Sequence, residues 1–112
     1  MIWNPECECM STAARQAMQF ARLKNLVEHV YNTVPFYRQK LDAAGISPAD
    51  ITCLADIAKL PFTTKADLRE TYPYGLLAVP QSEIVEVHMS SGTTGTPVVD
   101  AYTAKDLDDW AE

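Results

Sequence analysis

The sequence predicts an α/β chain that is mostly helical, in which several helices come first and a single β-hairpin follows. Three patterns support this prediction. Apolar residues recur at helical spacing from about Ser11 to Thr33, residues 84–89 alternate between apolar and polar side chains, and residues 98–102 favour a returning strand. A turn rich in glycine and threonine separates the two predicted strands, so we expect it at the tip of the hairpin.

The first part of the chain is divided by proline and glycine. Residues 1–10 show no regular period, and we expect an irregular arm there. The first helix stops before Pro35, which is suited to the first position of a second helix over 36–44. Gly45 then ends that second helix, because glycine adopts the left-handed conformation that commonly follows a helix.

Capping sequences mark the middle of the chain. The run 47–50 resembles a capping box and predicts a short turn, and 54–59 predicts another brief helical piece. Residues 60–62 are expected to be an extended connector. Thr64 begins a second capping box, and the helix that it starts should end near 72–73, where a proline follows.

The last third of the chain carries the hairpin. We expect a loop or short strand over 74–79 and a half-buried strand over 84–89. After the returning strand, Thr103 is placed to cap a last amphipathic helix that carries Leu107 and Trp110.

Length and charge limit the classes of function. The chain has 112 residues, the size of one ordinary domain, and its formal net charge is −6 from 9 basic and 15 acidic residues. Without a basic patch, nucleic acid is a poor candidate partner. No apolar run approaches the roughly eighteen residues that a membrane span needs, and the first residues lack the pattern of a signal peptide. We therefore expect no membrane partner and a cytoplasmic location.

The cysteines predict neither a disulfide framework nor a metal site. Cys7 and Cys9 lie too close together for an ordinary structural disulfide, and Cys53 leaves the count odd. A metal would need further ligands, but His29 and His88 are distant from the pair and from each other. We expect free thiols and no bound structural metal.

The turn between the predicted strands is the main candidate for function. Glycine lets the backbone approach a ligand closely, and successive N–H groups with neighbouring hydroxyls form a concavity suited to phosphate oxygens. The pattern matches neither a Walker A loop nor a dinucleotide fingerprint, and composition alone also allows a plain turn without a ligand. The candidate residues are Ser90, Ser91, Gly92, Thr93, Thr94, Gly95 and Thr96.

The run SSGTTGTP, with VVDAYT, DL and W after it, resembles the phosphate-binding loop of adenylate-forming enzymes, in the version found in phenylacetate–coenzyme A ligases. The stretches VPFYRQKLDAAGI, LPFTTKADLRETYPYGLLAVP and VEVHMSSGTTG are similar to the amino-terminal portion of the same family. The resemblance extends from about Phe20 to Trp110. It implies that residues 1–112 are an amino-terminal piece of the large AMP-binding domain, with no complete second domain.

The resemblance implies an activity in two steps. ATP and a carboxylic acid give an acyl-adenylate and pyrophosphate, and the thiol of coenzyme A then forms the thioester, with Mg²⁺ accompanying the nucleotide. It assigns binding of the β- and γ-phosphates to the run Ser90–Thr96. Two positions depart from the family: Thr96 stands where many members have lysine, and Asp100 where glycine is common. Both weaken the expected attraction for a nucleotide.

The remaining parts of such a site are expected beyond residue 112, so we expect no catalytic residue within this chain. These parts are a platform for adenine, an acidic residue for the ribose, a carboxylate for Mg²⁺ and a late lysine. A loop without its partners supplies little catalysis, and we expect the chain alone to be inactive. The alternative from another class is a small stand-alone helical interaction module whose Gly/Thr hairpin is only a turn.

Several further residues are ambiguous in the sequence. His88 lies two residues before the loop and is a second-rank candidate for contact with phosphate or substrate, although a structural role is the commoner explanation. We expect the aromatic residues of 35–37 and 72–74 to fill a core rather than line an aryl pocket. An uncovered groove on Phe20 and Val27, extending to Val34, would favour self-association, and members of the family are often homodimers.

Overall fold

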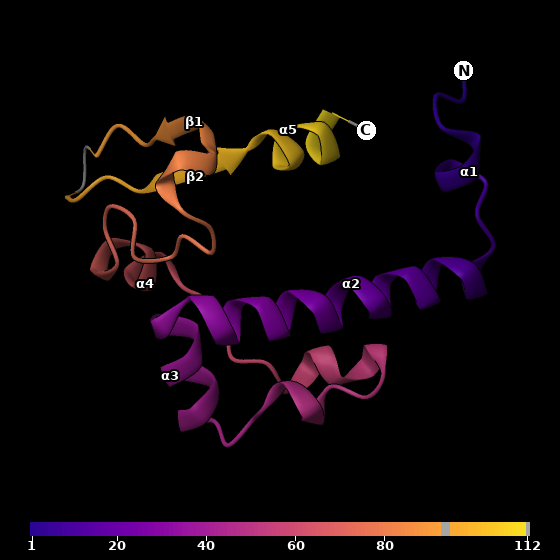
Figure 1. The fold of residues 1–112 in the computed structure, drawn as a ribbon, viewed down its shortest axis with the longest axis horizontal. Helices are drawn as coiled ribbons and strands as arrows, with labels where there is room; N and C mark the ends of the chain where they lie inside the picture. The colour runs from indigo at the N-terminus through magenta and orange to yellow at the C-terminus, as the bar shows by residue number, and fades with distance from the viewer. Residues whose placement is uncertain (93–94, 112) are drawn as a thin grey trace.

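The computed structural model describes residues 1–92 and 95–111, which form several helices and one two-stranded sheet (Figure 1). The elements follow one another as α1 (Pro5–Glu8), α2 (Thr12–Thr33), α3 (Pro35–Ala43), η1 (Pro48–Asp50), η2 (Leu54–Lys59), α4 (Lys65–Glu70), η3 (Gln81–Glu83), β1 (Ile84–Met89), β2 (Val99–Thr103) and α5 (Ala104–Ala111). In Figure 1, α3 and the short turns after it lie on one side of α2, and the hairpin with α5 lies on the other. The predicted order of helices followed by a hairpin is confirmed.

Helix α2 begins and ends where the sequence predicts. The Ser11 side chain accepts a hydrogen bond from the Ala14 N–H at 3.2 Å, which satisfies one of the N–H groups left over in a first turn. The helix ends at Thr33, because Val34 is extended, with φ −114° and ψ 104°, as the residue before a proline prefers. Pro35 then occupies the first position of α3, where its missing N–H is not needed.

The end of α3 lies one residue before the predicted position. Gly45 follows the helix with φ 69°, the left-handed region that favours glycine, and its N–H donates to the Asp42 carbonyl oxygen at 3.0 Å. The Ile46 N–H donates to the Leu41 carbonyl oxygen at 3.0 Å. These bonds turn the chain back, so that Ile46 packs against the core.

The prediction of an irregular arm over residues 1–10 is wrong for α1. The Asn4 side chain accepts a hydrogen bond from the Cys7 N–H at 3.2 Å, and Pro5 occupies the first turn of this short helix. The Glu8 carboxylate in turn accepts from the N–H groups of Trp3 and Asn4, at 2.7 Å each. These local capping contacts form a helical turn without an apolar period.

The core lies between α2, α3 and the segment that follows them. Its buried members are Val27, Leu41 and Ile51. The half-buried residues that pack against them are Phe20, Leu23, Tyr31, Ile46 and Leu60. The expected uncovered groove on α2 is therefore absent from the described part of the chain: Val27 and Val34 are buried, because α3 and the turns after it cover this face of the helix.

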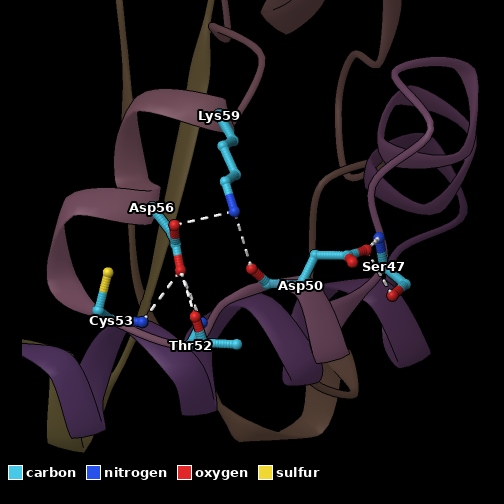
Figure 2. Close-up of polar contacts among 6 residues, drawn as sticks. All are labelled: Ser47, Asp50, Thr52, Cys53, Asp56 and Lys59. Atoms are coloured by element: carbon cyan, nitrogen blue, oxygen red, sulfur yellow. Dashed lines mark hydrogen bonds and ion pairs between the residues drawn. The ribbon is translucent and has the colours of Figure 1, made fainter.

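Capping boxes begin two of the short elements, as predicted. The Asp50 carboxylate accepts hydrogen bonds from the Ser47 N–H and hydroxyl, at 2.7 Å each (Figure 2). The Asp67 carboxylate accepts from the Thr64 N–H at 2.7 Å, and the Thr64 hydroxyl accepts from the Asp67 N–H at 3.3 Å. Asp67 also pairs with Lys40 of α3, which ties α4 to the helical region.

Asp56 holds the turn η2 by accepting several hydrogen bonds (Figure 2). One of its carboxylate oxygens accepts from the N–H groups of Thr52 at 2.7 Å and Cys53 at 3.0 Å. The other oxygen lies 2.9 Å from Nζ of Lys59. These contacts hold the pKa of Asp56 well below its usual range. The Lys59 ammonium has the largest effect, and the N–H donors of Thr52 and Cys53 come next.

The hairpin pairs β1 with β2 in antiparallel register and has faces of different polarity. Val87 lies opposite Ala101, and His88 lies opposite Asp100, so the two pairs point to opposite faces. The returning strand begins one residue later than predicted, at Val99. An irregularity in the register between Ile84 and Glu86 marks the start of β1.

The prediction that 84–89 forms a half-buried strand is right for the strand and wrong for its burial. Within the described residues no second layer covers the apolar face of β1, whose side chains are 48–64 % exposed: Val85, Val87 and Met89. The aromatic residues of 72–74 also differ from expectation, because Tyr72 and Tyr74 are exposed rather than in a core. Alternation in a sequence predicts which side chains share a face, and burial needs a partner for that face.

Candidate functional site

The glycine-rich loop lies at the tip of the hairpin, as predicted, where it joins the end of β1 to the start of β2 (Figure 1). Two of its expected ligand-binding residues, Thr93 and Thr94, lie outside the described residues. The structure describes the loop on both sides of them, through 90–92 and 95–98.

The neck of the loop is closed by Ser90 and Val98. The Ser90 N–H donates to the Val98 carbonyl oxygen at 3.0 Å, and the Val98 N–H donates to Oγ of Ser90 at 2.8 Å. Ser90 therefore has a structural role that the sequence did not indicate. Its hydroxyl oxygen accepts the hydrogen bond from the Val98 N–H, and the hydroxyl hydrogen can still donate to an anion.

Both loop glycines adopt positive φ, 64° at Gly92 and 133° at Gly95. The Gly95 N–H donates to the Gly92 carbonyl oxygen at 3.0 Å, which folds the loop back on itself. A Cβ at Gly92 would lie 3.0 Å from the Gly95 carbonyl oxygen and 3.4 Å from Cβ of Pro97. Gly92 is thus required for both its conformation and its close contacts.

The loop offers hydrogen-bond donors but no charge. Ser91 and Thr96 are exposed, and the run 90–97 contains no charged side chain. Asp100 and Glu86 bring carboxylates to the strands that carry the loop. The arrangement can bind an anion through neutral N–H and O–H donors, and charge compensation has to come from elsewhere.

His88 is directed to other partners on the polar face of the hairpin. Its Nε2 contacts a carboxylate oxygen of Glu86. The centre of its ring lies 5.2 Å from that of Tyr102 and 6.1 Å from that of Trp110. The sequence analysis did not find this cluster, although Glu86 and His88 are two residues apart in a strand and so share a face.

The described residues contain no group of three or more His, Cys, Asp or Glu side chains arranged to hold a metal ion. The three cysteines are exposed thiols: Cys7, Cys9 and Cys53. No helix in the described part of the chain is long and apolar enough to cross a membrane.

Solved structures with a similar fold are acyl-CoA ligases. The chain superposes on 2-hydroxyisobutyryl-CoA ligase in complex with 2-HIB-AMP and CoA with a TM-score of 0.83 and 36% identity, over 93% of this chain and 23% of that protein. A second structure of that ligase, in the postadenylation state, gives a TM-score of 0.82 and 33% identity over 93% of this chain and 22% of that protein. The fold is that of the amino-terminal part of an adenylate-forming CoA ligase.

Among the CoA ligases, the sequence relatives of this chain are phenylacetate-coenzyme A ligases. The chain is 54% identical over 96 residues to a phenylacetate-coenzyme A ligase of Aromatoleum evansii, over 86% of this chain and 22% of that protein. It is 50% identical over 112 residues to the phenylacetate-coenzyme A ligase of Thermus thermophilus, over 100% of this chain and 25% of that protein. The Escherichia coli enzyme of the same name is 48% identical over 114 residues, over 99% of this chain and 26% of that protein.

The chain is therefore similar to one stretch of the phenylacetate–coenzyme A ligases, and it spans about a quarter of the length of these curated relatives. No family model matches it. The resemblance identified from the loop and its flanking stretches is confirmed.

Proposed function

We propose that the complete protein to which this chain corresponds is an ATP-dependent ligase that joins an aryl carboxylic acid, phenylacetate or a close analogue, to coenzyme A. The observation that carries the proposal is the glycine–threonine loop at the closed tip of the hairpin, in a chain about half identical to ligases of that name. The exposed hydroxyl residues Ser91 and Thr96 stand beside two glycines, in a turn of the kind that binds anions such as phosphate.

The reaction that we propose has two balanced steps. The carboxylate attacks the α-phosphorus of ATP, which forms the acyl-adenylate and releases pyrophosphate. The thiol of coenzyme A then attacks the acyl carbon, and AMP leaves as the thioester forms. The loop would hold the β- and γ-phosphates as negative charge develops on the departing pyrophosphate. We assign this contact to the run Ser90–Thr96.

Mg²⁺ would enter with the nucleotide, and the described residues contain no group of three or more His, Cys, Asp or Glu side chains that could hold it. We propose that its protein ligands, the adenine and ribose contacts and the catalytic groups are supplied outside this chain. His88, which is paired with Glu86, is a weaker candidate for phosphate contact than the loop itself. The chain alone is then expected to be inactive, because it provides only one side of the site.

The test is to express the complete open reading frame and follow thioester formation from phenylacetate, ATP and coenzyme A, together with the release of AMP and pyrophosphate. We expect activity that depends on all three substrates, and none from residues 1–112 alone. A complete protein that is folded and monomeric but binds no ATP in isothermal titration would contradict the ligase and favour the interaction-module alternative.

A matched pair of glycine variants links the activity to the loop. Gly92→Ala introduces strain at φ 64° and a contact with the Gly95 carbonyl oxygen, so we expect KM for ATP to rise about tenfold or more. Gly45→Ala introduces similar strain at φ 69° in open space beside α3. We expect Gly45→Ala to keep the KM of the parent enzyme, and equal effects of the two variants would contradict the loop assignment.

The cytoplasmic location and the homodimer stay predictions. Fractionation of the source cells and sedimentation of the complete protein test them directly. A membrane-bound or strictly monomeric protein would contradict them without affecting the loop assignment.

A further inference from the structure

Three aromatic rings gather on the polar face of the hairpin, and each comes from a different element. The ring of Tyr102, on β2, stacks with the ring of Trp110, on α5, at 5.8 Å between centres and 23° between planes. The His88 ring, on β1, meets both of them edge-on, at 5.2 Å and 6.1 Å. The cluster therefore joins both strands of the hairpin to the helix that follows them.

Helix α5 holds Trp110 in a defined position relative to the strands. The Thr103 N–H and hydroxyl donate to the Asp106 carboxylate, at 2.8 Å each, and the Asp106 N–H donates to the Thr103 hydroxyl at 3.2 Å. Within the helix, Lys105 pairs with Asp109 at 2.6 Å. β2 runs directly into this capped helix, and from there the Trp110 side chain contacts rings on both strands of the hairpin.

The same two strands form the neck of the loop. Ser90 follows His88 by two residues, and Val98 precedes β2, so one residue pair, Met89 with Val99, separates the closing bonds between Ser90 and Val98 from the His88–Asp100 pair. On the other face of the hairpin the apolar side chains of β1 are exposed, and Val99 and Ala101 of β2 are half-buried. A two-stranded hairpin is marginal by itself, so contacts on the polar face decide how firmly the neck is closed.

We propose that Trp110 is a positioning residue: through Tyr102 and His88 it holds the two strands together at the neck and so keeps Ser90 and Ser91 in place for phosphate. The part of this proposal that concerns phosphate rests on the proposed function. The part that concerns the neck stands on the contacts of the described residues alone. Trp110 itself need not touch the ligand.

The first test measures amide hydrogen exchange of the Ser90 and Val98 N–H groups in the 112-residue chain. Trp110→Ala should speed their exchange about tenfold, and Trp110→Phe should keep most of the protection, because a ring remains to stack. Trp3→Ala is the matched control, since it removes an exposed tryptophan at the other end of the chain. Unchanged exchange in Trp110→Ala would overturn the proposal.

Amide exchange in the core of the helical region separates a local role of Trp110 at the neck from a general contribution to stability. If Trp110 only stabilised the chain as a whole, the amides of Val27 and Leu41 in the core of the helical region would exchange faster by the same factor as those of the neck. We expect them to keep the exchange rates of the unaltered chain. Equal acceleration in both places would also overturn the proposal.

The second test uses the complete protein and isothermal titration with MgATP. Trp110→Ala should weaken binding about fivefold or more, and Trp110→Phe should restore it, because a neck that is already closed spares the ligand the entropy of closing it. Absence of ATP binding by the unaltered protein would contradict the proposed function, and the exchange measurement would still decide the role of Trp110 at the neck. Unaltered affinity in Trp110→Ala would overturn the link to phosphate.

Discussion

The two sides of α2 differ in how they are held together. On one side, α3 and the turns after it enclose buried aliphatic side chains and add the carboxylate caps of Asp50 and Asp56. On the other side, the hairpin and α5 are held by backbone pairing and an aromatic cluster, and they expose an apolar face. The loop that we assign to phosphate lies on the less buried side. Binding loops belong to the least stable parts of proteins, and here that loop is set apart from the core.

The largest effect should come from the helical side. Leu41 is 4% exposed in the core, and Leu41→Ala should lower the free energy of unfolding by about 2–5 kcal/mol, because it removes buried methyl groups and leaves a cavity. Leu26, also on a helix but 58% exposed, is the matched control. Urea denaturation followed by circular dichroism measures both variants. If Leu26→Ala lowers the free energy of unfolding as much as Leu41→Ala does, the assignment of Leu41 to the core and of Leu26 to the surface is wrong.

Strain at the end of α3 should produce the next largest effect. Gly45→Ala forces a side chain into the left-handed region at φ 69° without any steric contact, so we expect a loss of about 1–2 kcal/mol in the free energy of unfolding. Thermal denaturation provides the measurement. A Tm unchanged from that of the parent chain would mean that Gly45 does not hold this conformation in solution.

Acid should weaken the helical side through Asp56. Its folded-state pKa is depressed, so its contribution to stability is fully present above the ordinary carboxyl value of about 3.9 and is lost as the pH falls below that value towards the folded-state pKa. Asp56→Asn should therefore flatten the fall of Tm between about pH 5 and pH 2. Equal slopes for Asp56→Asn and the parent chain would contradict the capping role.

The smallest effect on stability is expected on the apolar face of the hairpin. Val87→Thr keeps a β-branched side chain at an exposed strand position, and it should change the free energy of unfolding by no more than about 0.5 kcal/mol. It should nevertheless reduce binding of a hydrophobic dye such as ANS, because it makes an exposed apolar face more polar. A large loss of stability would mean that this face is covered in solution.

Local signals predicted most of the elements. The caps at Ser11, Ser47 and Thr64, the proline at the start of α3 and the glycine after it are each legible within a few residues, and the structure has them where expected, to within one residue. The short helix α1 was missed because its evidence is a cap without an apolar period.

What depends on distant partners was not predictable. The burial of Val27 and Val34 follows from α3 folding back onto α2, and the exposure of β1 follows from the lack of a second layer within the described residues. In the site, the composition of the loop was evident from the sequence. The closing bonds of Ser90 and the ring cluster around His88 depend on strand register, which alternation alone does not fix.

The positions of the two tryptophans have a consequence for spectroscopy. Trp3 lies beside α1 and Trp110 on α5, both exposed, whereas the described core residues that are buried are aliphatic, and those packed against them include no tryptophan. Intrinsic fluorescence therefore observes the arm and the hairpin side, while far-ultraviolet circular dichroism is dominated by α2. If the two sides of α2 unfold together, the two signals will share one midpoint; if the hairpin opens first, fluorescence will change at lower denaturant while ellipticity persists.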